Sequence, residues 1–254
     1  MTTTIVTAGK GGTGKTTIAA LLINILAHKG PVLAVDADPS TNLNLALGMP
    51  LDEHNTVGQM REDMATSVKS GTYDTSLSKP DYIELKIMES LVESEKIDLL
   101  AMGRPEGPGC YCAANNMLRA SIDRLGKNYT YVVIDCEAGM EHVSRQTTRE
   151  IDILLIVSDP TIRGIMAAAR MKPLIKEMRT YVGQIWLIVN RVDGDLPSQI
   201  LAAVQEYDLD LIASIPRDPN LAALEIQGEP SIKLPPDSPL QVSVREVASK
   251  LGLC

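Results

Sequence analysis

The sequence contains no phenylalanine and a single tryptophan, although 44% of its 254 residues are hydrophobic. A buried core must therefore be aliphatic, and a chain of this length can bury a large one. No apolar run reaches the roughly 18 residues that a membrane-spanning helix needs. A basic excess is missing too, since the net charge is −8 and the pI is about 5.0. These absences argue against a membrane partner and against nucleic acid bound on a general basic surface.

Cysteine is also scarce, at four residues. The chain starts with a strand-like segment, TTTIVTA, that no charged region precedes, so we expect no secretory leader and a cytoplasmic protein. In a reducing compartment, cysteines are thiols or metal ligands more often than disulfides.

Short runs rich in valine and isoleucine alternate with helix-length periodic segments. Such apolar strands are typical of a parallel sheet covered by helices on both faces, so we predict a doubly wound α/β fold, as one domain over residues 1–254. The expected strands are Thr4–Thr7, Val32–Asp36, Ile97–Met102, Tyr131–Asp135, Ile153–Ser158, Ile185–Asn190 and Leu211–Ile215. The expected helices are Lys15–His28, Ala113–Leu125, Arg163–Met178, Ser198–Glu206 and Leu240–Leu251. A polar stretch, Gln59–Pro80, interrupts the alternation and is expected on the surface.

A glycine-rich segment, AGKGGTGKTTIA, follows the first expected strand and satisfies two phosphate-binding patterns. Gly9, Gly11 and Gly14 fit the dinucleotide fingerprint G-x-G-x-x-G, which implies hydride transfer, and Asp36 stands where a ribose-binding acid would. Gly9–Thr16 fit the P-loop pattern G-x-x-x-x-G-K-[ST], which implies nucleotide hydrolysis. The glycines alone do not decide between the two patterns.

Lys15 and Thr16 favour the P-loop, because a β/γ-phosphate needs the lysine and a neighbouring Mg²⁺ ion needs the hydroxyl. The backbone N–H groups of such a loop and the positive end of the following helix also attract phosphate. Asp135 ends the buried strand YVVID and is suited to hold the Mg²⁺ shell. The loop carries a second lysine, Lys10, that the P-loop pattern does not explain.

The segment GKGGTGKTT resembles the deviant Walker A motif of the ParA/MinD/nitrogenase-iron-protein class of P-loop ATPases. The resemblance covers nearly the whole chain: VDADPSTNL is similar to switch I of that class, DCEAGMEH to switch II, and IVNR and IPRD to its adenine-binding loops. In this class the lysine at the position of Lys10 reaches the nucleotide of a partner subunit. The resemblance therefore implies a homodimer that binds ATP and Mg²⁺.

The same resemblance implies a role for each matched residue. Lys10, Lys15 and Asp38 would be catalytic: Lys15 would contact the β- and γ-phosphates, and Asp38 would position the attacking water. Mg²⁺ would be held by Thr16 and, through water, by Asp36 and Asp135. The residues expected to bind the nucleotide are Gly9, Gly11, Gly12, Thr13, Gly14, Lys15, Thr16, Thr17, Asn190, Arg191, Pro216, Arg217 and Asp218.

The segment EGPGCYCAANNMLRA places Cys110 and Cys112 in a loop near residues 107–113, just before an expected helix. Two thiolates make half of a tetrahedral shell, and two copies meeting on a dimer axis would complete a Cys₄ site. Together with the Walker A and DCEAGMEH segments, this C-x-C is most similar to the CooC-type ATPases, which serve nickel insertion into carbon monoxide dehydrogenase. The resemblance implies Ni²⁺ or Zn²⁺ at an intersubunit site and a nickel-containing client enzyme, carbon monoxide dehydrogenase.

Three other functions stay open. One is an electron-transfer ATPase with an iron–sulfur cluster, like the nitrogenase iron protein. Another is a positioning ATPase of the MinD or ParA kind, against which the acidic charge and the lack of a basic amphipathic tail count. The last is a scaffold that binds nucleotide without turnover, against which a complete switch I counts. Cys136 is expected to be a small buried side chain, and the sequence assigns no role to Cys254 or His142.

Overall fold

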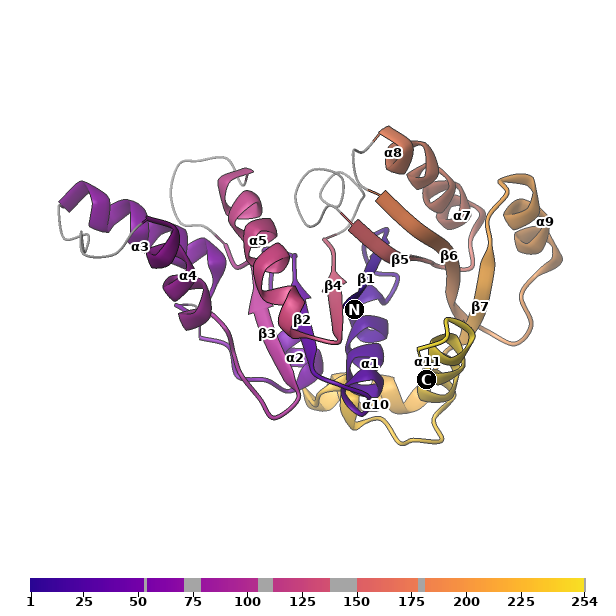
Figure 1. Ribbon diagram of the computed structural model, residues 1–254. Helices are drawn as coiled ribbons and strands as arrows, with labels where there is room; N and C mark the ends of the chain where they lie inside the picture. Colours follow the sequence, from indigo (N-terminus) through magenta and orange to yellow (C-terminus); the bar gives the residue numbers. More distant parts are fainter. Residues whose placement is uncertain (53, 71–78, 105–111, 138–149, 178–180, 254) are drawn as a thin grey trace.

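The computed structural model describes residues 1–52, 54–70, 79–104, 112–137, 150–177 and 181–253. Its centre is a sheet of seven strands in the order β3-β2-β4-β1-β5-β6-β7, in which every pairing is parallel (Figure 1). The strands are β1 (Thr3–Gly9), β2 (Val32–Asp36), β3 (Ile97–Ala101), β4 (Tyr131–Asp135), β5 (Glu150–Ser158), β6 (Tyr181–Val192) and β7 (Leu211–Pro216). All seven expected strands are confirmed, and because they are parallel, their carboxyl ends meet at one edge of the sheet.

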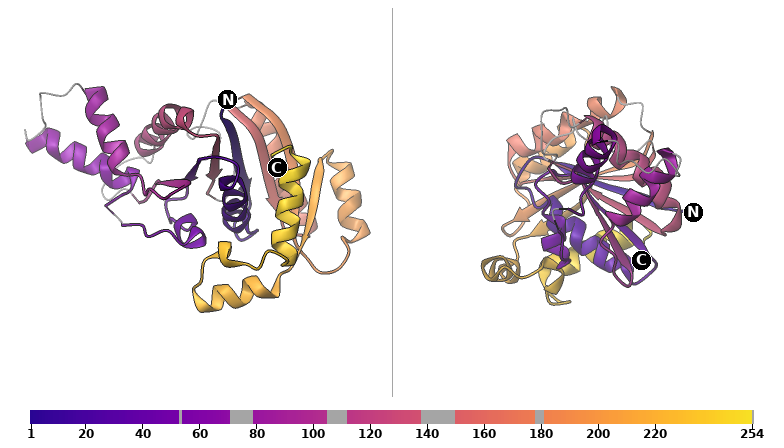
Figure 2. Two further views of the ribbon diagram at one scale, coloured as in Figure 1. Left: turned by 60° about the horizontal axis from the view of Figure 1, so that its bottom comes forward. Right: turned by 90° about the vertical axis from the view of Figure 1, so that its left-hand side faces the viewer.

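Helices cover both faces of this sheet, as an end view shows (Figure 2). One face carries α1 (Lys15–Ala27), α2 (Leu43–Leu47), α10 (Pro219–Gln227) and α11 (Pro239–Lys250). The other face carries α3 (Val57–Ser70), α4 (Lys79–Glu89), α5 (Cys112–Leu125), α7 (Ile162–Ala169), α8 (Met171–Glu177) and α9 (Ser198–Glu206). Two 3₁₀ turns, η1 (Gly126–Asn128) and η2 (Ser231–Lys233), complete the described elements. The predicted doubly wound α/β fold is therefore confirmed.

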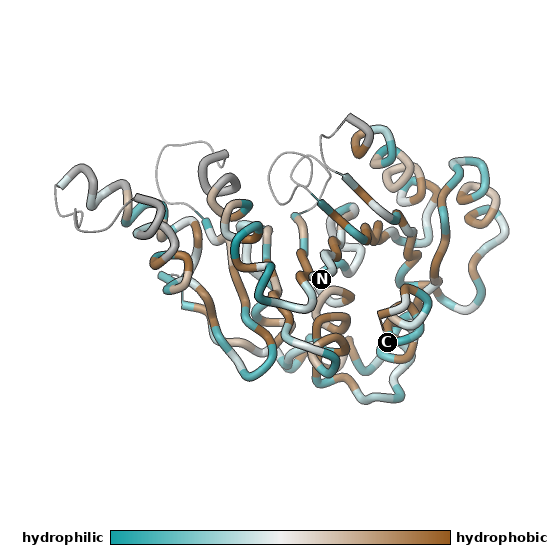
Figure 3. Tube along the Cα trace, in the orientation of Figure 1, coloured by the Kyte–Doolittle hydropathy of each residue, from teal (hydrophilic) through white to brown (hydrophobic). Residues whose placement is uncertain are grey.

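The strands are apolar throughout because each face of the sheet packs against helices. In β2, Val32 and Ala34 join the core beneath α1, whereas Leu33 and Val35 join the core on the opposite face. Successive side chains of a strand point to opposite faces, so a strand covered on both sides needs an unbroken apolar run. Along the trace, the strands of the sheet are coloured mostly as hydrophobic, whereas many connecting segments are hydrophilic (Figure 3). None of the described helices is long and apolar enough to cross a bilayer.

One expectation about the helices is wrong, and two helices lie where the sequence did not predict any. The segment Arg163–Met178 was expected to form one helix, but α7 ends at Ala169 and α8 begins at Met171. Pro173 explains the break, since proline lacks the N–H that would bond the carbonyl of Ala169. The polar stretch Gln59–Pro80 contains most of α3 and the start of α4, and the two helices extend beyond β3 (Figure 1).

Candidate nucleotide-binding site

The glycine-rich loop connects β1 to α1, and its backbone can be formed only with glycine at two positions. Gly9 has φ 148°, and a Cβ there would lie 2.2 Å from the carbonyl oxygen of Val157 on the adjacent strand β5. Gly14 has φ 90°, and a Cβ there would lie 2.5 Å from Nδ2 of Asn190. A side chain at either position would clash with a residue of another strand. The glycines are therefore required by tertiary packing as well as by the conformation of the loop.

Inside the loop, two side chains converge on the backbone carbonyl of Lys10. The hydroxyl of Thr13 donates to it at 3.0 Å, and the ammonium of Lys15 donates at 3.2 Å. Lys15 is only 8% exposed. At the start of α1, Gly14 offers no side-chain cap to the N–H groups of the first turn. A buried cation and uncapped helix N–H groups together form an anion-binding site of the kind a phosphate occupies.

Asp135 lies at the carboxyl end of β4, where it bonds two hydroxyls. Thr16 donates to one of its oxygens at 2.5 Å and Thr7 to the other at 2.8 Å. Burial raises the pKa of Asp135 to about 6, although both hydroxyl bonds oppose the rise. Because the Thr16 hydroxyl uses its proton on Asp135, its lone pairs are free for a cation. Thr16 and Asp135 therefore fit the magnesium site that the sequence predicts.

Asp36 is the register partner of Asp135 on β2 and is 1% exposed. Its carboxylate accepts backbone N–H groups from Asp38 at 3.1 Å and from Asn42 and Leu43 at 2.9 Å. Burial raises its pKa to about 7, the N–H bonds oppose the rise, and the charge of Asp135 adds to it. Asp36 thus anchors the turn that follows β2, a contribution that the sequence analysis missed. Within that turn Asp38 accepts the N–H of Ser40 at 2.8 Å.

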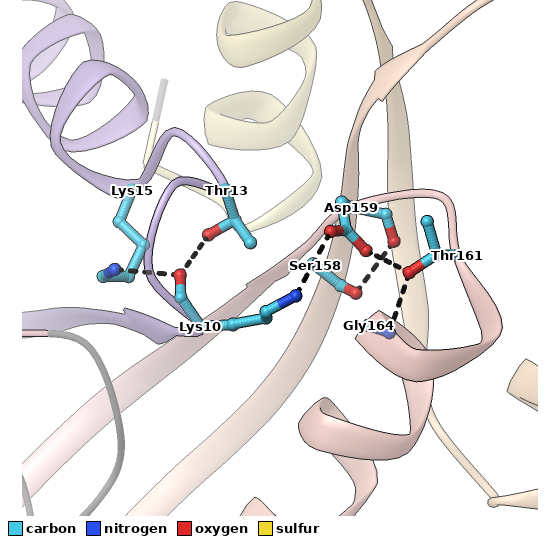
Figure 4. A network of polar contacts seen from close by, with 7 residues as sticks. All are labelled: Lys10, Thr13, Lys15, Ser158, Asp159, Thr161 and Gly164. Carbon is cyan, nitrogen blue, oxygen red and sulfur yellow. Dashed lines mark hydrogen bonds and ion pairs between the residues drawn. The ribbon is translucent and has the colours of Figure 1, made fainter.

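Lys10 extends away from Lys15 and toward Asp159, which follows β5 (Figure 4). Its ammonium lies 3.9 Å from the Asp159 carboxylate, and the Lys10 side chain is 56% exposed. The hydroxyl of Thr161 donates to Asp159 at 2.6 Å and accepts the N–H of Gly164 at 3.0 Å, which caps α7. The two lysines of the loop therefore have separate environments, Lys15 buried and Lys10 at the surface.

The predicted adenine-binding segments meet the glycine-rich loop at a pocket of about 530 Å³, which we call the Asn190 pocket. The amide of Asn190 donates to the carbonyl of Thr13 at 2.8 Å and ties the end of β6 to the loop. Arg191, which follows, has φ 63°, a strained conformation for a non-glycine residue. Seven of the predicted nucleotide-binding residues line the pocket: Gly14, Thr17, Asn190, Arg191, Pro216, Arg217 and Asp218.

Asp218 has a structural role that the sequence analysis did not identify. It is the N-cap of α10, where it accepts the N–H of Asn220 at 2.8 Å, and its second oxygen accepts the N–H of Leu240 in α11 at 3.1 Å. Burial alone would raise its pKa, but the N–H bonds from Leu240 and Asn220 bring the pKa below its usual value. Sequence analysis also missed the wall that α10 and α11 add to the pocket, at Pro219, Leu221, Ala222, Glu225 and Leu240. The dipeptide Asp-Pro at 218–219, a helix-start signal, could have indicated α10.

The cysteine predictions fall only partly on described residues. Cys110, His142 and Cys254 lie outside the described residues, and of Cys112 the structure describes only its place at the start of α5. Cys136 is buried in the core at 2% exposure, and burial raises the pKa of its thiol, which confirms the expectation of a small buried side chain. Over the described part of the chain, no cluster of three or more His, Cys, Asp or Glu residues could hold a metal ion. The Cys₄ site stays a prediction.

Comparison with known proteins matches residues 4–232 to the CobQ/CobB/MinD/ParA nucleotide binding domain. An uncharacterized ATP-binding protein of Methanocaldococcus jannaschii is 40% identical over 248 residues, which cover 97% of each chain. The carbon monoxide dehydrogenase accessory protein CooC of Rhodospirillum rubrum is 32% identical over 236 residues, which cover 88% of this chain and 87% of CooC.

Solved structures show the same fold. The cell division ATPase MinD of Pyrococcus furiosus superposes with a TM-score of 0.71 at 24% identity, covering 99% of both chains. MinD of Pyrococcus horikoshii, solved with Mg-ADP, superposes with a TM-score of 0.70 at 23% identity, covering 99% of this chain and 96% of its own.

Proposed function

This chain belongs to the CobQ/CobB/MinD/ParA family of nucleotide-binding domains, and we propose that it works within that family as a dimeric nickel metallochaperone. It is an ATPase of the MinD/ParA type. In the proposal, ATP binding and hydrolysis are coupled to the binding of nickel and its delivery to a client enzyme, carbon monoxide dehydrogenase.

The phosphates of ATP lie, in this proposal, on the loop N–H groups and on the ammonium of Lys15. The buried position of Lys15 and the uncapped start of α1 support this placement. The adenine occupies the Asn190 pocket, whose volume suits a small-molecule ligand. A bound Mg²⁺ ion beside Thr16 and Asp135 would neutralise charge on the β- and γ-phosphates.

Hydrolysis needs a positioned water and compensation for the charge that develops on the γ-phosphate. Asp38 is proposed to orient the water, because Asp36 anchors the turn that carries it. Lys10 is proposed to act on the nucleotide of the partner subunit. Its exposed position, directed away from its own phosphate loop, supports that proposal.

The proposal that the protein binds a metal ion rests on one structural observation, the position of Cys112. Cys112 begins α5, the helix that follows β3, and β3 ends at the same carboxyl edge of the sheet as β1 and β2, which the phosphate loop and the Asp36 turn follow. In the proposal, a change at the nucleotide is transmitted to Cys112 through these neighbouring strand ends. The 32% identity to CooC, a carbon monoxide dehydrogenase accessory protein, supports carbon monoxide dehydrogenase as the client enzyme.

Metal analysis with mass measurement tests the shared site. The apo protein is titrated with Ni²⁺ or Zn²⁺, and we expect one ion per two chains, with affinity falling below neutral pH because thiolates must lose protons to bind. Cys110→Ala or Cys112→Ala should abolish binding, whereas the matched control Cys136→Ala, at a buried thiol, should not.

The shared-site proposal would be contradicted by a Cys112→Ala dimer that still binds the ion, or by a monomer that binds it with full affinity. Iron and acid-labile sulfide in the purified protein would instead favour the iron–sulfur alternative, since neither Ni²⁺ nor Zn²⁺ held by thiolates brings inorganic sulfide.

A further inference from the structure

A second pocket, of about 540 Å³, shares no lining residue with the Asn190 pocket. Its lining comes from the turn after β2 with the start of α2, from the segment that leads into α3 with the first turn of that helix, and from Gly103 and Arg104 after β3. We call it the Arg104 pocket. Its volume lies in the range of small-molecule sites, and nothing in the proposed ATP mechanism uses it.

The walls of the Arg104 pocket are held in place by backbone contacts. The N–H of Gly58, in the first turn of α3, donates to the carbonyl of Met102 at 2.8 Å. Gly103 has φ 66°, and a Cβ there would lie 2.4 Å from the side chain of Thr56. The end of β3 is therefore packed directly against the start of α3, and the pocket is formed before any ligand arrives.

Among the described residues, the lining of the pocket carries a positive side chain, whereas the protein as a whole is acidic. The chain carries 32 acidic and 24 basic residues, yet no carboxylate is among the described lining residues, which include Arg104 and His54. Within the described part of the chain, neither of these two side chains takes part in an ion pair. A guanidinium presents a fork of donors that matches a carboxylate or phosphate. The lining therefore favours an anion.

Asn44, in α2, adds a second and independent sign of a ligand. It lines the pocket, is 8% exposed, and its side-chain oxygen has no hydrogen-bond partner among the described residues. Buried polar atoms without a partner are rare in folded proteins. Thr41, also in the lining, has φ 43°, and strained backbone of this kind gathers at ligand sites. The unpartnered atom of Asn44 is an acceptor, so it calls for a ligand that carries a hydrogen-bond donor besides its anionic group.

We propose that the Arg104 pocket binds a small organic anion carrying a carboxylate or phosphate group, and that its occupancy changes the rate of ATP turnover. The coupling rests on the proposed role of Asp38. The carboxylate of Asp38 accepts the N–H of Ser40 at 2.8 Å, and its backbone carbonyl accepts the N–H of Thr41 at 3.1 Å. Ser40 and Thr41 both line the pocket, so a ligand there contacts the turn that positions Asp38. Because coupling is reciprocal, ATP would alter the affinity for the anion to the same degree.

Isothermal titration calorimetry tests the binding, on the full chain saturated with Mg·ADP so that the phosphate loop is occupied. The probes are glycerol 3-phosphate for a phosphate source and malate for a carboxylate source, each with a hydroxyl donor for Asn44, and glycerol and malamide are the uncharged controls. We expect one of the two anions to bind once per chain and neither control to bind. Arg104→Gln should weaken that binding by more than about tenfold, since the charged donor fork is lost.

Arg245→Gln, at an exposed arginine of α11, is the matched control and should bind as the wild type does. Equal melting temperatures and ADP affinities establish that both variants are folded. Binding of neither anion, or equal binding by Arg104→Gln, would overturn the site.

Phosphate release from ATP, measured with and without the bound anion, tests the coupling. The wild type should change its rate by about twofold or more, and Arg104→Gln should not respond. An unchanged rate at a saturated pocket would refute the coupling. Normal hydrolysis by Asp38→Ala would refute the proposed role of Asp38 and leave the anion binding intact, so the two failures are distinguishable.

Discussion

Replacement of Asp218 by alanine separates a structural role for this residue from nucleotide binding. The change removes the N-cap of α10 and leaves the N–H groups of Asn220 and Leu240 without their acceptor. Losing an N-cap costs about 0.5–2 kcal/mol, and a hydrogen bond to a charged group contributes about 1.5–3 kcal/mol. The unfolding free energy should therefore fall by about 3 kcal/mol. In a protein of this size that corresponds to a loss of about 6–12 °C in Tm.

Thermal unfolding followed by circular dichroism measures this loss, with Asp237→Ala as the control at an exposed neighbouring acid. The pKa of Asp218 lies below its usual value of 3.8 in the folded protein. Its stabilising contribution is therefore complete above that usual value and is lost as the pH falls through the lower, folded-state pKa. The difference in Tm between wild type and Asp218→Ala should persist at neutral pH and shrink below about pH 4. A Tm within about 2 °C of the wild type, together with an ATP affinity reduced more than tenfold, would refute the capping role and make the carboxylate a nucleotide ligand.

The remaining predictions concern turnover. Lys15→Ala should weaken ATP binding and hydrolysis together in a binding and phosphate-release assay, whereas Asp38→Ala should bind ATP and stall as a dimer; normal turnover by Asp38→Ala would remove that residue from the mechanism. Lys10→Ala and Lys15→Ala proteins should each be inactive alone and should regain activity when mixed. The reason is that one site of the hybrid dimer has its own Lys15 and receives Lys10 from the partner subunit. No recovery despite hybrid formation would show that Lys10 acts in the site of its own subunit. Asp159→Asn should change Tm little, because its partner Lys10 is 56% exposed and such a solvent-screened ion pair contributes at most about 1 kcal/mol. By releasing Lys10 it should strengthen ATP-dependent dimerisation by no more than about fivefold per site. A weaker dimer would show that Asp159 assists the trans contact.

Local sequence patterns were sufficient for the sheet and for the phosphate loop. A strand buried on both faces has to be an unbroken apolar run, so the segments around Val32–Asp36 and Tyr131–Asp135 were recognisable without any knowledge of their neighbours. The P-loop pattern is equally local, because Lys15 and Thr16 follow the glycines directly along the chain. The helices α3 and α10 were missed, since few of their side chains are buried and their apolar periodicity is correspondingly weak.

Only the tertiary structure decided what the polar residues contact. Asn190 lies 177 positions from Thr13, and no sequence pattern states that its amide would bond that carbonyl. No sequence pattern predicts that the two carboxylate oxygens of Asp218 bond the starts of α10 and α11. Nor does any pattern predict that Lys10 lies beside Asp159. Hydrophobic periodicity is a property of residues that are close along the chain, and it can therefore be recognised in the sequence alone. The partner of a buried carboxylate or amide depends on strand order and on the packing of distant segments, and these exist only once the chain has folded.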